Sequence, residues 1–117
     1  MEKFVMITYL FDFYQDLLTD KQRDLLKEYY FEDFSLGELS QQHQISRQSV
    51  FDTIKKAEQK LLDYESKLHL FTKHQEEQEI LLNIKDLCNN ITASLEGKET
   101  KNIQQVITLL DGLMNKI

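Results

Sequence analysis

The stretch that decides the fold is SLGELSQQHQISRQSVFDTIKKAEQK, residues 35–60. Ser35 and Glu38 have the spacing of a capping box, in which a hydroxyl and a carboxylate each accept a hydrogen bond from a backbone N–H at the start of a helix. The apolar residues of this helix are Leu36 and Leu39. The helix is expected to end near His43, so it is a short one.

A second helix is expected directly after a tight turn. Ile45 can plug the turn with an apolar side chain, and Ser46 is the next candidate N-cap residue. Apolar residues then recur at intervals of four, three and four, as on one face of a helix, at Val50, Ile54, Ala57 and Leu61. Because that face must look inward, the stretch predicts a helix-turn-helix.

The opposite face of the second helix predicts contact with DNA. In a helix-turn-helix the start of the second helix enters the major groove. Arg and Gln can each make two hydrogen bonds to one base edge, hydroxyls can bind phosphate or base, and Lys suits phosphates. Asp52 can accept from cytosine or hold Lys56, four residues on. The predicted DNA-binding residues are Arg47, Gln48, Ser49, Asp52, Thr53, Lys55, Lys56 and Lys60. The alternative, an ordinary charged surface helix, leaves the two caps and the apolar stripe without a reason.

Residues 18–62 resemble region 4 of bacterial sigma factors, the part that reads the −35 promoter element. The matching pieces are LT at 18–19, KQR at 21–23, YYF at 29–31, SL at 35–36 and ISRQSV at 45–50. The whole chain resembles the YlxM-like family of small bacterial proteins. That resemblance implies a helical, sigma-region-4-like fold and a regulatory role associated with the signal recognition particle pathway.

Two positions depart from the usual form of the motif. The turn between the helices often has glycine, because the backbone there can require a positive φ, and Gln44 occupies it here. Gly37 lies instead in the first turn of the first helix, where it costs up to ~1 kcal/mol relative to alanine. Both departures predict a softer motif than that of a dedicated sigma factor.

Two further helices are expected before the motif. The first spans residues 4–18, with an apolar stripe at Phe4, Ile7, Phe11, Tyr14 and Leu18. The second begins after Thr19, which forms a capping box with Gln22. Its apolar residues are Leu25, Leu26, Tyr29 and Tyr30. Together with the motif they make a domain predicted to cover residues 1–62.

Residues 63–117 are predicted to form a helical tail. The stripe of the second motif helix continues through Leu61, Tyr64, Leu68 and Phe71. Two more stripes follow, one at Leu81, Ile84, Cys88, Ile91 and Leu95, the other at Ile103, Ile107, Leu110, Met114 and Ile117. Glu96, Gly97 and Lys98 mark a helix stop, and Thr100 is a candidate cap for the last helix. The short connection predicts an antiparallel hairpin, whose apolar surface either covers the N-terminal helix or meets a second copy in a homodimer.

Charge is distributed unevenly along the chain. Residues 1–45 carry nine acidic and four basic side chains, residues 46–62 carry two and four, and residues 63–117 carry nine and six. The predicted recognition helix is therefore the only net-positive block, at +2, in a chain of net charge −6. Non-specific DNA binding should be weak, because it comes from neutralising phosphates, and two copies would strengthen it.

No catalytic, cofactor or metal site is expected. The sequence has no glycine-rich phosphate loop and no nucleophile motif, and His69 and His74 do not share a helical face. Cys88, the single cysteine, is most simply a small core residue and suits a reducing, cytoplasmic location. The longest apolar run, residues 4–11, is far short of the ~18 residues of a membrane span, and a signal peptide is not expected.

Two functional hypotheses follow. The first is a DNA-binding regulator that uses the second motif helix. The second is a non-enzymatic, all-helical interaction protein whose helix-turn-helix is a scaffold, with RNA polymerase or a protein or RNA of the signal recognition particle as its partner. A basic protein partner would use the acidic residues spaced four apart from Asp12 to Glu32.

Overall fold

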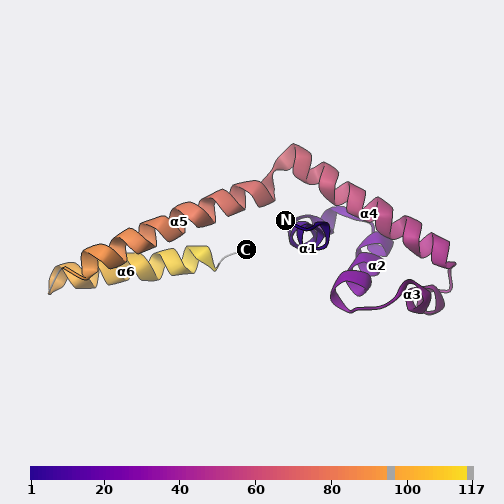
Figure 1. Cartoon of the computed structure of the whole chain (residues 1–117), viewed down its shortest axis with the longest axis horizontal. Helices are drawn as coiled ribbons and strands as arrows, with labels where there is room; N and C mark the ends of the chain where they lie inside the picture. Colours follow the sequence, from indigo (N-terminus) through magenta and orange to yellow (C-terminus); the bar gives the residue numbers. More distant parts are fainter. Residues whose placement is uncertain (95–96, 116–117) are drawn as a thin grey trace. The chain divides into compact units, whose positions relative to one another are not determined.

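The computed structural model describes residues 1–94 and 97–115, and within these residues it contains six α-helices and no strand (Figure 1). The helices are α1 (Lys3–Tyr14), α2 (Asp20–Phe31), α3 (Leu36–His43), α4 (Arg47–Leu68), α5 (Leu70–Thr92) and α6 (Lys98–Met114). A single 3-10 turn, Gln15–Leu17, follows α1. The expected all-α fold is confirmed. The chain divides into two compact units, Met1–Phe71 and Thr72–Ile117.

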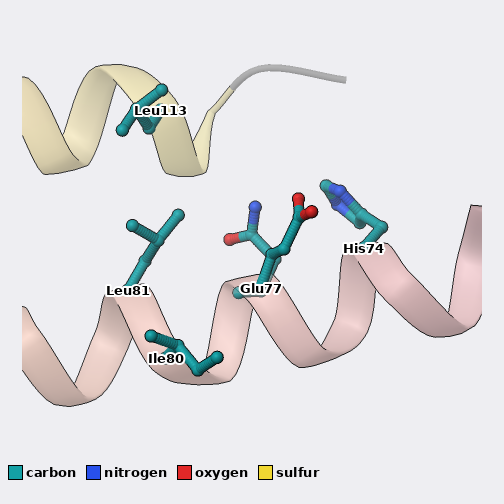
Figure 2. A pocket seen from close by; sticks show the side chains of 6 residues that line it. His74, Glu77, Ile80, Leu81 and Leu113 are labelled. Atoms are coloured by element: carbon teal, nitrogen blue, oxygen red, sulfur yellow. The ribbon is translucent and has the colours of Figure 1, made fainter.

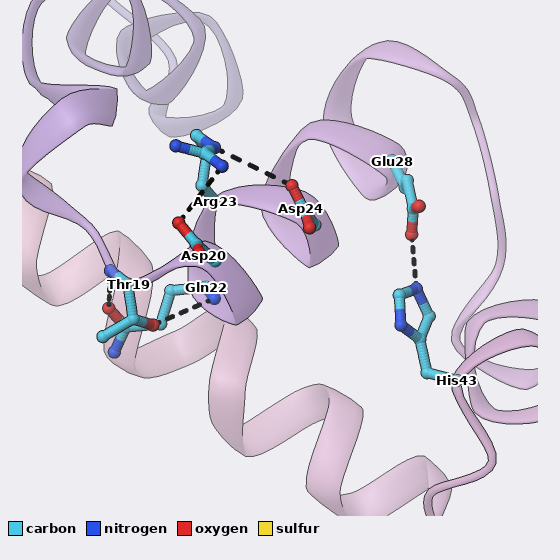
Figure 3. Close-up of polar contacts among 7 residues, drawn as sticks. All are labelled: Thr19, Asp20, Gln22, Arg23, Asp24, Glu28 and His43. Carbon is cyan, nitrogen blue, oxygen red and sulfur yellow. Dashed lines mark hydrogen bonds and ion pairs between the residues drawn. The ribbon is translucent and has the colours of Figure 1, made fainter.

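The helix starts of the N-terminal unit are set by the expected local hydrogen bonds. At the start of α2, the Thr19 hydroxyl accepts from the Gln22 N–H at 3.2 Å, and the Gln22 side chain accepts from the Thr19 N–H at 3.1 Å (Figure 3). The same reciprocal pair joins Ser35 and Glu38 at the start of α3, at 3.1 and 3.0 Å. Both predicted capping boxes are confirmed.

Helix α4 is the element on which α1, α2 and α3 all pack (Figure 1). The predicted inward residues of α4 are all buried: Val50, Ile54, Ala57 and Leu61. Their partners on α1 include Ile7, Phe11 and Tyr14, as expected, and Leu10, which the stripe omitted. Phe4 was expected in the core but is 51% exposed; it lies in the first turn of α1, with its ring 4.7 Å from that of Tyr30. The core therefore lies between α4 and the three preceding helices.

Polar contacts join α2 to its own first turn and to α3. Arg23 forms ion pairs with Asp20 at 3.2 Å and with Asp24 at 3.7 Å (Figure 3). Farther along α2, Glu28 Oε2 lies 2.7 Å from Nε2 of His43 at the end of α3. The last contact joins the end of α3, the first motif helix, to α2. At least one acidic residue of α2, Glu28, therefore contributes to the packing of these helices.

A buried carboxylate links three helices of this unit. Glu58 on α4 is only 4% exposed, and its Oε1 accepts a 2.8 Å hydrogen bond from the Tyr30 hydroxyl. Its Oε2 lies 3.1 Å from Nζ of Lys3 and 3.6 Å from Nζ of Lys55. The hydrogen bond to Glu58 and the negative charge of that carboxylate raise the pKa of Lys3 above its ordinary value. Burial, followed by the bond to Glu58, raises the pKa of Tyr30.

The end of α4 differs from the sequence prediction. The apolar stripe was expected to continue through Leu68, but α4 stops there, Leu68 is largely exposed, and His69 adopts a left-handed conformation with φ 55°. Phe71 is buried in the N-terminal unit, with its ring 5.2 Å from that of Tyr9. The compact N-terminal unit thus includes Phe71.

In the C-terminal unit, α6 runs back alongside α5 as the expected hairpin (Figure 1). Lys85 on α5 and Asp111 on α6 form a 2.8 Å ion pair, and Ile107 and Leu110 are buried. Thr100 was expected to cap α6, but the helix begins at Lys98 with Gly97, at φ 78°, as its N-cap residue. Thr100 therefore lies inside the first turn. The predicted roles of Leu95, Glu96 and Ile117 fall outside the described residues.

Many apolar side chains of this hairpin remain exposed. On α5 they are Ile80, Leu82, Ile84, Leu87 and Ile91, and on α6 they are Val106, Leu109 and Leu113. Leu87 is 62% and Leu109 is 65% exposed. In the described part of the chain, none of the helices has the combination of length and apolar character needed to cross a bilayer.

Candidate nucleic-acid interface

The turn that presents α4 is held by its own backbone and one hydroxyl. Gln44 adopts the left-handed conformation, φ 54° and ψ 45°, at the position where many such motifs have glycine. The Ser40 hydroxyl donates a 2.5 Å hydrogen bond to the Ile45 carbonyl, and the Ser46 hydroxyl accepts a 3.0 Å bond from the Ser49 N–H. The predicted cap at Ser46 is confirmed. These contacts fix where α4 begins.

The exposed face of α4 carries a row of polar side chains at four-residue intervals. Gln48, Asp52 and Lys56 follow one another along the helix, and all three are exposed. Ser49, also exposed, lies beside the row. The Gln48 side chain donates a 2.9 Å hydrogen bond from Nε2 to Oδ1 of Asp52. The sequence suggests cytosine or Lys56 as the partner of Asp52, whereas in the structure that partner is Gln48.

Arg47 is exposed, and its guanidinium lies beside Gly37 of α3. A Cβ built on Gly37 would be 2.5 Å from Nη2 and 3.1 Å from Nε of Arg47. The first of these distances is shorter than real Cβ contacts, so the guanidinium would have to shift to admit a side chain at position 37. Gly37, which looked like a weakness of α3, thus permits this approach. A glycine in the first turn of a helix was the signal that could have indicated it.

The other predicted contact residues have partners within the chain or are partly buried. Nζ of Lys60 donates a 3.1 Å hydrogen bond to the Gln22 side chain, and Thr53 is half-buried. Lys55 is paired with the buried Glu58, and its Nζ also lies 5.4 Å from the centre of the Phe51 ring. The structure therefore brings Gln48, Ser49, Asp52 and Lys56 together on the exposed face, and it gives Lys55 and Lys60 intramolecular partners.

Phe51 was not among the predicted contact residues. It is 42% exposed on α4, where Lys55 lies over its ring. An aromatic residue outside the buried stripe, with a lysine four residues on, is the sequence signal for this pair. Lys55 thus contacts two residues of its own helix, Phe51 and Glu58.

Outside this face, the described residues include a pocket and the single cysteine. They contain no group of three or more His, Cys, Asp or Glu side chains that could hold a metal ion. A pocket of about 390 Å³ lies in the C-terminal unit, where Leu81 of α5 faces Leu113 of α6 (Figure 2). Its other lining residues are His74, Glu77, Gln78 and Ile80. Cys88 is half-buried on α5.

The buried stripe of α4, the capped turn and the exposed polar row define an all-α protein of the helix-turn-helix class. The chain belongs to the family described as "UPF0122: Putative helix-turn-helix protein, YlxM / p13 like", whose model matches residues 1–106. The expected membership of the YlxM-like family is confirmed. The resemblance to sigma region 4 and the association with the signal recognition particle stay predictions.

Relatives of similar length support this assignment. The chain is 42% identical to the UPF0122 protein YlxM of Bacillus subtilis over 113 residues, which cover 97% of each chain. It is 47% identical over 105 residues to a UPF0122 protein of Bacillus velezensis, covering 85% of this chain and 96% of that one. A UPF0122 protein of Oceanobacillus iheyensis is 51% identical over 85 residues, or 73% and 81% of the two chains.

Proposed function

We propose that this protein is a DNA-binding regulator without enzymatic activity, which reads duplex DNA with the start of α4. The observation that carries the proposal is the exposed row of Gln48, Asp52 and Lys56 on a capped second helix whose opposite face is buried. This is the arrangement in which a helix-turn-helix places side chains against base edges.

The distribution of charge predicts weak non-specific binding to DNA. The block of residues 46–62 has a net charge of +2, while the blocks before and after it are acidic. Few phosphates can be neutralised by one copy, so affinity must come from base contacts or from a second recognition helix. A homodimer formed by the exposed apolar side chains of α5 and α6 would supply that second helix.

Dimer formation can be tested separately from DNA binding. Sedimentation equilibrium of the full chain should show a dimer, and Leu109→Lys should shift it toward the monomer, because Leu109 is among the most exposed apolar residues of α6. Lys101→Ala, an exposed charge on the same helix, is the matched control. A wild-type chain that stays monomeric at every concentration contradicts the dimer.

DNA binding is tested by selecting from a pool of randomised duplexes at low and physiological salt. Wild type should enrich a defined motif, and Arg47→Ala should lose or relax it. Lys56→Ala should weaken binding to all sequences alike and reduce the salt slope by about one, because it removes one phosphate contact. Lys101→Ala again serves as the control. Binding that is weak, shows no enrichment and disappears as salt rises contradicts the proposal.

A second candidate function is favoured by the exposed apolar residues of α5 and α6, which suit a protein partner. In this version the helix-turn-helix is a scaffold, and the partner is RNA polymerase or a protein or RNA of the signal recognition particle in the cytoplasm. A basic protein would bind the acidic side of α1 and α2. Charge reversal is best made at Asp12 and Asp16, which are exposed, because reversal at Glu28 would also break its contact with His43. Loss of partner binding in that variant, with Arg47→Ala harmless, would favour this function.

A further inference from the structure

We propose that Gln48 reads an adenine in the major groove and that Asp52 is the positioning residue that sets the orientation of its amide. This inference deepens the proposed function and rests on it. It is carried by the 2.9 Å hydrogen bond from Nε2 of Gln48 to Oδ1 of Asp52 on the exposed face of α4.

The orientation of the Gln48 amide follows from chemistry. An ionised carboxylate only accepts hydrogen bonds, so the group that faces Asp52 must be the NH₂ of Gln48 and not its carbonyl oxygen. Without such a partner, the two ends of an exposed glutamine amide can exchange by rotation about the last side-chain bond. Asp52 therefore determines which end of the amide is the donor and which is the acceptor in the frame of the helix.

The remaining hydrogen-bonding groups of Gln48 match one base. One N–H is used by Asp52, which leaves the second N–H and Oε1 as an adjacent donor and acceptor. In the major groove adenine presents an acceptor at N7 beside a donor at N6, and glutamine can bond to both. Guanine presents two acceptors there, so Oε1 would face another acceptor. The fixed amide thus favours adenine and disfavours guanine.

The position of Gln48 in the helix suits this role. It is the second residue of α4, after the Ser46 cap, and the first residues of a recognition helix are the ones that meet base edges. Arg47, the preceding residue, is also exposed, with its guanidinium beside Gly37, and Gln48 is the first residue of the row that continues with Asp52 and Lys56. Asp52, one turn farther along α4, accepts the hydrogen bond from the Gln48 amide.

The same helix contains a matched control. Nε2 of Gln59 donates to Oδ1 of Asp63, also at 2.9 Å, and both residues are exposed. This pair has the same chemistry and spacing, but it lies three helical turns farther from the start of α4. Removing Asp63 changes the charge of the chain as much as removing Asp52 does, and it should leave base preference untouched.

The experiment uses the full chain and a pool of randomised duplex DNA, with selection and sequencing for wild type, Gln48→Ala, Asp52→Ala, Asp52→Asn and Asp63→Ala. Circular dichroism checks that each variant keeps its helical content. The base pair whose preference disappears in Gln48→Ala is the one that Gln48 reads. Four duplexes that differ only at that base pair then give Kd ratios by fluorescence anisotropy.

The inference expects adenine at that base pair in the wild-type motif, with a discrimination of about fivefold to a hundredfold over the other bases. Asp52→Ala should reduce this ratio several-fold at that base pair alone, while binding all duplexes somewhat more tightly because one negative charge is removed. Asp52→Asn should keep part of the ratio, since its carbonyl oxygen can still accept from Gln48. Asp63→Ala should retain the wild-type ratio.

The experiment distinguishes failure of this inference from failure of the proposed function. A motif that depends on Arg47 but has no adenine tied to Gln48, or an unchanged ratio in Asp52→Ala, overturns this inference and leaves the proposed function standing. The absence of any enriched duplex overturns both.

Discussion

The hydroxyl of Tyr14 donates a 2.7 Å hydrogen bond to Oε1 of Glu65, joining α1 to the last turns of α4. The same hydroxyl accepts a 3.1 Å bond from the Leu70 N–H, and Oε1 of Glu65 accepts a 3.0 Å bond from the Phe71 N–H. Two backbone donors at the start of α5 are therefore satisfied by side chains from α1 and α4. This network compensates for the left-handed His69 that separates α4 from α5.

Tyr14→Phe should lower the free energy of unfolding by about 1–2 kcal/mol, because the Leu70 N–H and the Glu65 carboxylate each lose a partner. Urea denaturation followed by circular dichroism measures the change. Tyr64→Phe is the matched control, since its hydroxyl makes one exposed 3.2 Å bond to the Leu17 carbonyl, and it should cost less than about 0.5 kcal/mol. Equal effects of the two substitutions would show that the network adds no stability.

Alkaline pH should destabilise the protein through its buried tyrosines. Burial, followed by the bond to Glu65, raises the pKa of Tyr14 from its ordinary value near 10 to about 12. The neutral phenol is thus favoured in the folded state. This contribution to stability is complete below the pKa of the unfolded side chain and is lost as the pH rises from about 10 to about 12. Denaturation curves across this range should show a smaller fall in Tyr14→Phe than in wild type, and identical pH profiles would contradict the shift.

Gln44→Gly should stabilise the protein by about 1 kcal/mol. Gln44 has φ 54°, a conformation that costs an L residue roughly 1–2 kcal/mol and glycine almost nothing, although glycine loses more entropy on folding. Gln41→Gly, in the interior of α3, should instead destabilise by up to about 1 kcal/mol. Thermal and urea unfolding measure both, and a destabilised Gln44→Gly would show that the turn does not require glycine's freedom.

Gly37→Ala should separate stability from DNA binding. The added Cβ would displace the Arg47 guanidinium, while the helix itself should gain up to about 1 kcal/mol. On the proposed function, affinity for the selected duplex should fall as it does in Arg47→Ala. Gly112→Ala is the control, because it lies in α6 and its Cβ would meet nothing within 4 Å. If Gly37→Ala binds the selected duplex as tightly as wild type, the placement of Arg47 against Gly37 is unimportant for binding.

The polar row of the candidate site could be predicted from the sequence, but the partners of its residues could not. Helical periodicity alone places Gln48, Asp52 and Lys56 on the exposed side of α4. It could not show that Lys60 is bonded to Gln22 on α2, or that Lys55 is drawn to the buried Glu58. Those pairings depend on how the helices pack against one another. The pattern of residues within one helix does not determine that packing.

What the sequence by itself determined is local. The capping boxes at Thr19 and Ser35, the cap at Ser46 and the buried stripe of α4 all involve residues that lie within a turn or two of each other, so short-range sterics and hydrogen bonding suffice. What only the tertiary structure decided is the set of contacts between distant segments, such as Tyr30 with Glu58 and Tyr14 with Glu65. The helix break at His69 belongs to this second set. No glycine or proline marks it, and the backbone takes a left-handed conformation there because side chains from α1 and α4 satisfy the N–H groups that the break leaves open.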